Sequence, residues 1–311
     1  MENNKIQFRK KRDIGDIINV TFSFIKEHFV HFLSMQVLIS LPFALIAIIL
    51  ISVIPTSDLF TVDNFSKNIG QNIISILVYA MAGFSLLVFL VSAVYQYTAL
   101  YMKKGTYFSI TELYTAILSN FWVMSQTYIF LTFVMIGVYI GIGLLAALFF
   151  TMGGAGAFLG GIWVFVGVLA SIYFFIPLSF VFVIRSFEPE KSFWASLKRA
   201  QYLVKDNWWA CFGLSFITGI IQAVIIGVMK IPFAIFGMAD ITQVNFTGAL
   251  SVAVIVELIT RMITSFLPTL AATFQYFSLV EMKDATGLNE QVEKFGTVAN
   301  NDENEDEKED Y

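Results

Sequence analysis

Six apolar stretches, each long enough to cross a bilayer as a helix, restrict what this chain can fold into. A helix needs about 20 apolar residues to cross the hydrocarbon layer. The stretches cover residues 31–54, 72–101, 122–150, 157–184, 208–229 and 250–279. Hydrophobic residues make up 57% of the chain and charged residues only 14%, far from the composition of soluble proteins. We therefore predict an all-α polytopic membrane protein with six transmembrane helices, arranged as three helical hairpins.

The distribution of Lys and Arg predicts how these helices are oriented. Sixteen of the 19 lie in the N-terminal segment, in the 102–121 and 185–207 loops, and in the C-terminal tail. Only Lys67 and Lys230 lie in the opposite loops. Because the cytoplasmic loops of membrane proteins are rich in Lys and Arg, we expect a multi-pass protein of the inner (cytoplasmic) membrane with both termini in the cytoplasm.

An amphipathic segment precedes each predicted hairpin. Its apolar residues recur at helical spacing, which predicts a helix with one apolar face. These residues are Ile14, Ile17, Ile18, Ile25, Phe29 and Phe32 in the first segment, Ile110, Leu113, Tyr114, Ile117, Leu118 and Phe121 in the second, and Phe193, Leu197, Ala200, Val204 and Trp208 in the third. Ser109 and Glu112 fit a capping box. We expect interfacial helices on the inner membrane surface. For the first segment, packing on the cytoplasmic ends of the spans is an alternative compatible with this.

The places where amphipathic segments meet spans resemble one another. They are His28-Phe29, Asn120-Phe121-Trp122 and Asn207-Trp208-Trp209, spaced 92 and then 87 residues apart. Aromatic rings with a polar end favour the headgroup level of a membrane. The spacing predicts parallel repeats over 13–104, 109–186 and 192–283 within a transmembrane domain of residues 1–280.

The two ends of the chain and its glycine-rich stretches carry further expectations. Residues 1–12 are polar and basic, and we expect little order there. Residues 281–311 hold eleven acidic residues and three Lys, which predicts a disordered acidic cytoplasmic tail that either aids solubility or binds a basic partner. The small residues Gly137, Gly141 and Gly143 are expected to allow close helix approach. The glycines of 153–161 are expected to serve a turn or helix packing.

Two motifs resemble a known family. They are Arg12-Asp-Ile-Gly15-Asp-Ile-Ile before an aromatic-rich helix, and Ser196-Leu-Lys-Arg-Ala200 followed by Asn207-Trp-Trp-x-x-Phe-Gly213. This pattern resembles the membrane domain found in front of some bacterial glycerophosphodiester phosphodiesterases and in many stand-alone bacterial membrane proteins. The resemblance covers most of residues 12–280 and implies the membrane fold. It implies no hydrolase activity, because the chemistry of those enzymes resides in a separate barrel domain that is absent here.

Few residues of this chain have side chains suited to catalysis or metal binding. The two histidines, His28 and His31, lie beside Glu27, and no second cluster supplies further ligands or a base. Cys211 is the only cysteine, so the chain forms no internal disulfide. We predict no enzyme, no metal and no cofactor.

Glu257 and Arg261 form the one charged pair expected inside a span. Charged groups in lipid are costly and normally pair, and a spacing of four residues on a helix allows this pairing. The pair either fixes helix packing or forms a polar site for an anionic headgroup, an ion or a proton.

Two functions fit these observations. The first is a non-enzymatic scaffold or lipid-interacting protein, whose partners are membrane lipids and a protein bound through the cytoplasmic helices or the acidic tail. Nucleic acid is not an expected partner. The alternative is a small transporter or channel-like permease that uses Glu257 and Arg261.

Overall fold

The chain is helical throughout the part that the structure describes. The computed structural model describes residues 6–53, 69–235, 260 and 264–285, and no strand occurs among them. In chain order the helices are α1 (Ile14–Val53), α3 (Ile69–Lys104), α4 (Ile110–Phe150), α5 (Gly154–Phe187), α6 (Phe193–Val204), α7 (Trp208–Ile235) and α9 (Phe266–Asp284). A short 3-10 helix, η1 (Lys205–Asn207), joins α6 to α7. The predicted all-α fold is confirmed for these residues.

Among the described residues, three helical segments are long and apolar enough to cross a membrane. They are α4, α5 and the stretch Phe193–Pro232, which contains α6 and most of α7. Only 6% of the most apolar window of α4 is buried inside the protein, so this helix presents its apolar side chains to its surroundings. A helix in lipid does the same. These segments support the prediction of a membrane protein, whereas the full set of six spans and three hairpins stays a prediction.

Two helices continue through positions where a separate amphipathic helix was expected to end and a span to begin. α1 and α4 each join an amphipathic segment to an apolar stretch without interruption. At 1.5 Å per residue, the 41 residues of α4 extend for about 61 Å, twice the roughly 30 Å of the hydrocarbon layer. The separate interfacial helix expected in every unit is therefore found only in the third unit, where η1 separates α6 from α7.

Serine side chains begin two of these helices. The Ser109 hydroxyl accepts a hydrogen bond from the backbone N–H of Glu112 at 3.2 Å, and the Ser192 hydroxyl accepts one from Ala195 at 3.3 Å. Such caps satisfy N–H groups that have no partner inside the helix. The predicted cap at Ser109 is confirmed. The Glu112 carboxylate, however, accepts hydrogen bonds from Lys104 at the end of α3.

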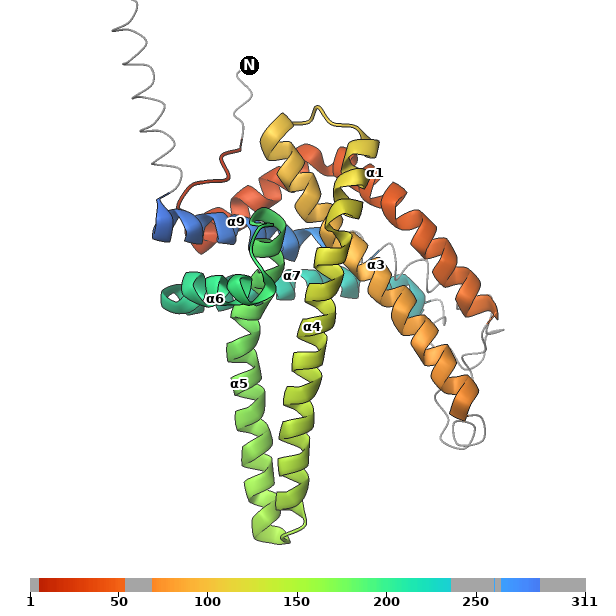
Figure 1. Ribbon diagram of the computed structural model, residues 1–311, viewed down its shortest axis with the longest axis vertical. Helices are drawn as coiled ribbons and strands as arrows, with labels where there is room; N and C mark the ends of the chain where they lie inside the picture. The colour runs from red at the N-terminus through yellow and green to blue at the C-terminus, as the bar shows by residue number, and fades with distance from the viewer. Residues whose placement is uncertain (1–5, 54–68, 236–259, 261–263, 286–311) are drawn as a thin grey trace, which may run out of the picture.

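The helices meet around α9. This helix contacts α1, α3, α5, α6 and α7, and it is buried over most of its length. Figure 1 shows α4 and α5 extending side by side away from α9, while α1 and α3 diverge from them in another direction. We call α9 and the side chains packed on it the hub. Its large buried aromatic residues include Phe8, Phe24, Phe32, Tyr97, Tyr101, Phe266, Phe274, Tyr276 and Phe277.

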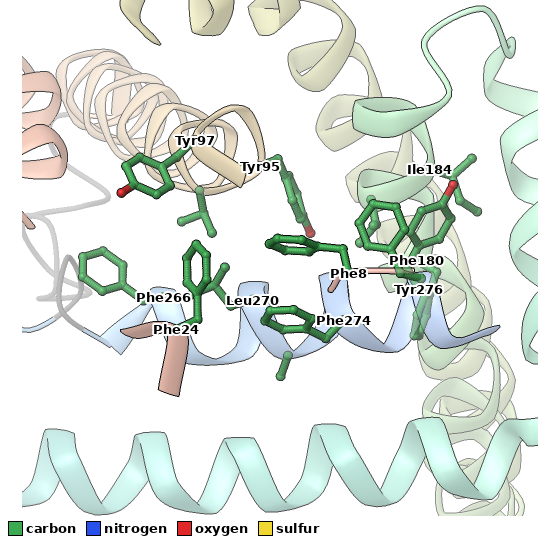
Figure 2. Packing of buried hydrophobic residues seen from close by; sticks show 14 of the residues in the cluster. Phe8, Phe24, Tyr95, Tyr97, Phe180, Ile184, Phe266, Leu270, Phe274 and Tyr276 are labelled. Carbon is green, nitrogen blue, oxygen red and sulfur yellow. The ribbon is translucent and has the colours of Figure 1, made fainter. Parts of the chain in front are cut away.

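The N-terminal segment is part of the hub. Figure 2 shows Phe8 above Phe274 of α9, and their rings stack with centroids 4.9 Å apart. Beyond Phe8, the backbone N–H of Arg12 donates to the Ser278 hydroxyl at 2.9 Å, and this hydroxyl donates to the Arg12 carbonyl at 3.1 Å. The expectation of little order in residues 1–12 is therefore wrong for residues 6–12. One apolar ring in a basic segment is enough to anchor it to the core.

Glycines bring α4 and α5 together, but they are not the ones expected from the third apolar stretch. A Cβ on Gly156 would overlap the Phe149 carbonyl, and a Cβ on Gly160 would lie 3.0 Å from the Phe150 ring. The expected role of the 153–161 glycines is confirmed at these two positions. By contrast, no described atom lies within 4 Å of a Cβ built on Gly137, Gly141 or Gly143, so the close approach expected there is not found among the described helices.

Candidate functional site

The junction between α5, α6 and α9 holds a network of charged side chains. Glu188 ends α5, and its carboxylate accepts a hydrogen bond from the Tyr276 hydroxyl of α9 at 2.6 Å. The same carboxylate lies 3.4 Å from the Arg199 guanidinium of α6, which also pairs with Asp284 of α9. Each partner is at most 26% exposed, so solvent screens the network only in part. These bonds hold α6 against the other two helices.

A second layer of contacts holds the outer edge of the same junction. Lys283 of α9 pairs with Asp206 of η1, and Lys191 lies 3.4 Å from Glu188. The Tyr202 ring is flanked by two cations, with Arg199 5.6 Å and Lys283 5.3 Å from its centroid. Cations favour the face of an aromatic ring. We refer to α6, η1 and the residues bound to them as the α6 junction.

The α6 helix has one face in the protein and one face outside. Ala200, Leu203 and Val204 are at most 1% exposed and pack into the hydrophobic core. On the outside, Trp194 is 60% exposed and Trp209, at the start of α7, is 77% exposed. In Figure 1, α6 lies crosswise at the end of α5. The junction therefore presents two indole rings at the point where an apolar helix ends.

The predicted junction residues share a pattern of exposure. The spacing of 92 and then 87 residues between the junctions aligns Val30 with Trp122 and Trp209. These three side chains are 78%, 66% and 77% exposed. The preceding residue packs inward in two units: Phe121 contacts the Phe89 ring at 4.8 Å, and the Trp208 indole N–H donates to the Tyr173 carbonyl at 3.0 Å. Phe29 is 38% exposed and is the exception.

The first residues of the three junctions do not form a shared site. His28 is buried, while Asn120 and Asn207 are half-buried. The Asn120 side-chain nitrogen has no hydrogen-bond partner. Among the described residues, no hydrogen bond or ring contact links one junction to another, so the structure does not bring the three together.

The two histidines lie on α1 and contact aromatic rings of α3. The His28 ring meets the Tyr101 ring at 4.7 Å, and the His31 ring lies 5.8 Å from Tyr97. The Nε2 atoms of both histidines and the Tyr97 hydroxyl are buried without a hydrogen-bond partner. Burial lowers the pKa of His28 below the ordinary value of 6.5, because a buried imidazolium loses its water. Glu27 opposes this shift and His31 adds to it.

This burial predicts a loss of stability in mild acid. Because the unfolded chain takes up a proton at His28 near pH 6.5 and the folded chain does so at a lower pH, the unfolded state binds more protons between these values. The free energy of unfolding should therefore fall as the pH drops below about 6.5, by at most about 1.4 kcal/mol per pH unit. Thermal unfolding in a neutral detergent from pH 8 to pH 5 measures this. His28→Asn, which introduces the residue found at the two matching junctions, should flatten the curve. Parallel curves for the two proteins would contradict the assignment.

Several predicted features lie outside the described residues. These are the Glu257 and Arg261 pair and the acidic tail beyond residue 285. Whether Glu257 and Arg261 line a polar site or fix packing stays a prediction, and so does the permease function that depends on them. Within the described ranges, no three His, Cys, Asp or Glu side chains are arranged to hold a metal ion. Cys211 is 1% exposed and accepts a hydrogen bond from Gln275 at 3.6 Å.

The charged residues of the α6 junction were not singled out from the sequence. Glu188 and Tyr276 are 88 positions apart in the chain, so sequence spacing gives no sign that they meet. One signal was available: Arg185, Glu188, Glu190 and Lys191 are the first charged residues after the apolar part of α5. Lys and Arg directly after an apolar stretch are typical of the cytoplasmic end of a span.

The comparisons with known proteins add no assignment. No family model, no curated protein and no solved structure matches this chain. The resemblance to the membrane domain of the phosphodiesterases stays a prediction from the sequence.

Proposed function

We propose that this protein is a non-enzymatic scaffold of the inner membrane, whose α6 junction engages the headgroups of the cytoplasmic leaflet. The observation that carries this proposal is the position of α6 at the end of α5, with one face buried and the indole rings of Trp194 and Trp209 exposed. Indole rings favour the headgroup level because one end is apolar and the other donates a hydrogen bond.

The length of α5 supports this depth for the junction. No charged residue occurs from Gly154 to Ile184, and Arg185 follows. At 1.5 Å per residue, the helix rises about 46 Å from Gly154 to Arg185. A bilayer with its headgroups is about 40–45 Å thick. If the α4–α5 turn is at the outer surface, α6 begins at the inner headgroups.

The charge of the junction supports the same partner. Lys198 and Lys205 are exposed, and no ion pair of the described residues involves them. Each Lys near an anionic leaflet contributes about 1 kcal/mol of attraction. The proposed scaffold also has six spans, three repeats and both termini in the cytoplasm. It binds a protein partner through its cytoplasmic helices or its acidic tail.

Depth-dependent quenching of tryptophan fluorescence tests the proposal. A variant that keeps Trp209 and replaces the other four Trp by Phe is reconstituted into vesicles that contain nitroxide-labelled lipids. We expect stronger quenching by a label near the headgroup than by a label at the end of the acyl chain. The control keeps only Trp163, whose indole bonds to the Ile142 carbonyl between α4 and α5 and which should respond to the deeper label.

A different quenching pattern would contradict the proposal. If Trp209 is quenched by aqueous acrylamide and by neither lipid label, the α6 junction does not contact the membrane. Lipid engagement by this junction would then be excluded.

A further inference from the structure

Arg185 is a buried cation without a partner. It lies in the last turn of α5 and is 7% exposed. Its Nε atom is buried without a hydrogen-bond acceptor, and no ion pair among the described residues includes it. The other buried or half-buried arginines differ. Arg199 pairs with two carboxylates, and the Arg12 guanidinium donates to backbone carbonyls at Phe8 and Lys10.

An unpaired guanidinium is costly to bury. It stays charged at every physiological pH and carries five N–H donors, which lose their water inside a protein. Proteins offset this cost by placing an acceptor, usually an anion, against the group. The closest carboxylate along α5 is Glu188, one turn away, and it is already bonded to Arg199, Tyr276 and Lys191. Among the described residues, no carboxylate is therefore paired with Arg185.

We propose that the end of α5 binds a phosphate group, with the buried Arg185 as its cation. The planar guanidinium suits phosphate oxygens because it can donate two parallel hydrogen bonds. Phosphate is also the anion present at the depth assigned above to the end of α5. The site deepens the proposed function and rests on it for the source of the ligand, which is either a phospholipid headgroup or inorganic phosphate.

Thermal unfolding of the full chain in a neutral maltoside detergent tests the site. The probes are dioleoyl phosphatidylglycerol, dioleoylglycerol, which has the same chains and no phosphate, and inorganic phosphate against chloride at equal ionic strength. A ligand of the folded state raises the unfolding midpoint. We expect phosphatidylglycerol to raise it by several degrees and dioleoylglycerol to leave it unchanged. If inorganic phosphate alone has this effect, the site takes free phosphate, and the proposal holds with that source.

Arg185→Met provides the sharper comparison. Without ligand, this variant should unfold at or above the midpoint of the wild type, because it removes an unpaired buried charge. With phosphatidylglycerol the order should reverse, since only the wild type gains stability. Lys103→Met, which removes an exposed charge from the last turn of α3, should keep the full lipid response. Equal responses of Arg185→Met and the wild type would overturn the proposal.

The wild type alone also decides the matter if Arg185→Met does not fold. A wild-type midpoint that neither phosphatidylglycerol nor inorganic phosphate raises above its control overturns the site. The quenching of Trp209 by headgroup labels is a separate measurement. Shallow quenching without a phosphate response would remove this site and leave the proposed function in place. A response to inorganic phosphate without shallow quenching would do the reverse.

Discussion

Phe274→Ala should lower the free energy of unfolding by about 3–5 kcal/mol, the range expected when a large buried aromatic side chain is truncated. Phe274 is 0% exposed at the centre of α9. Its ring stacks on Phe8 at 4.9 Å, meets Phe24 edge to face at 6.1 Å, and lies 5.6 Å from the Arg12 guanidinium. Truncation removes contacts with the N-terminal segment and with α1 at once, and it leaves a cavity that rigid helices cannot close.

Chemical unfolding in a neutral detergent measures this loss, and Phe133→Ala is the matched control. Phe133 lies on α4 and is 70% exposed, so its truncation should cost less than about 1 kcal/mol. The two substitutions delete the same atoms from a buried and an outward-facing position. Equal losses for the two variants would show that α9 is not the centre of the packed core.

Gly156→Ala should destabilise the protein by up to about 3 kcal/mol, at the upper end of the cost of overpacking. A Cβ at this position would overlap the Phe149 carbonyl and lie 2.5 Å from the Met152 Cβ. A backbone carbonyl has no rotamer with which to move away. The first turn of α5 would therefore have to separate from the end of α4, and the thermal midpoint in detergent should fall accordingly.

Gly141→Ala is the control for this substitution. Nothing lies within 4 Å of a Cβ built on Gly141, so the change adds a methyl group to an outward-facing position. Alanine favours a helix over glycine by about 0.5–1 kcal/mol, and the variant should be as stable as the wild type or slightly more stable. A large loss at Gly141 would indicate that a second protein surface covers this part of α4.

The apolar stretches predicted from the sequence account for the helices that extend away from the hub. Length and hydropathy are local properties, so the spans 122–150, 157–184 and 208–229 were expected before any contact was known. They lie within α4, α5 and the stretch Phe193–Pro232. The start of α4 at Ser109 was predictable for the same reason, because a cap depends on residues three positions apart. The glycines of α4 show the limit of local patterns. Gly137 and Gly141 have suitable spacing, but helix α5 approaches α4 elsewhere.

The hub could not be predicted, because its contacts join segments that are distant in the chain. Residues 266–279 were expected to end a sixth span, and their Thr, Gln and Ser residues gave no sign of a central buried helix. Those polar groups are accommodated locally, since the Thr269 and Thr273 hydroxyls donate to carbonyls four residues earlier in the chain. The candidate phosphate site has the same origin. Arg185 was counted as a loop charge, and its burial depends on how α4 and α6 pack.

The place of Phe8 in the hub has a consequence for how the protein is made. Its stacking partner, Phe274, is synthesised 266 residues later, so Phe8 cannot dock until α9 has been made. The helices from α3 to α7 are synthesised during that interval, and the hub can assemble only after α9 has followed them. A ribosome stalled before α9 would hold these helices without the centre around which they pack.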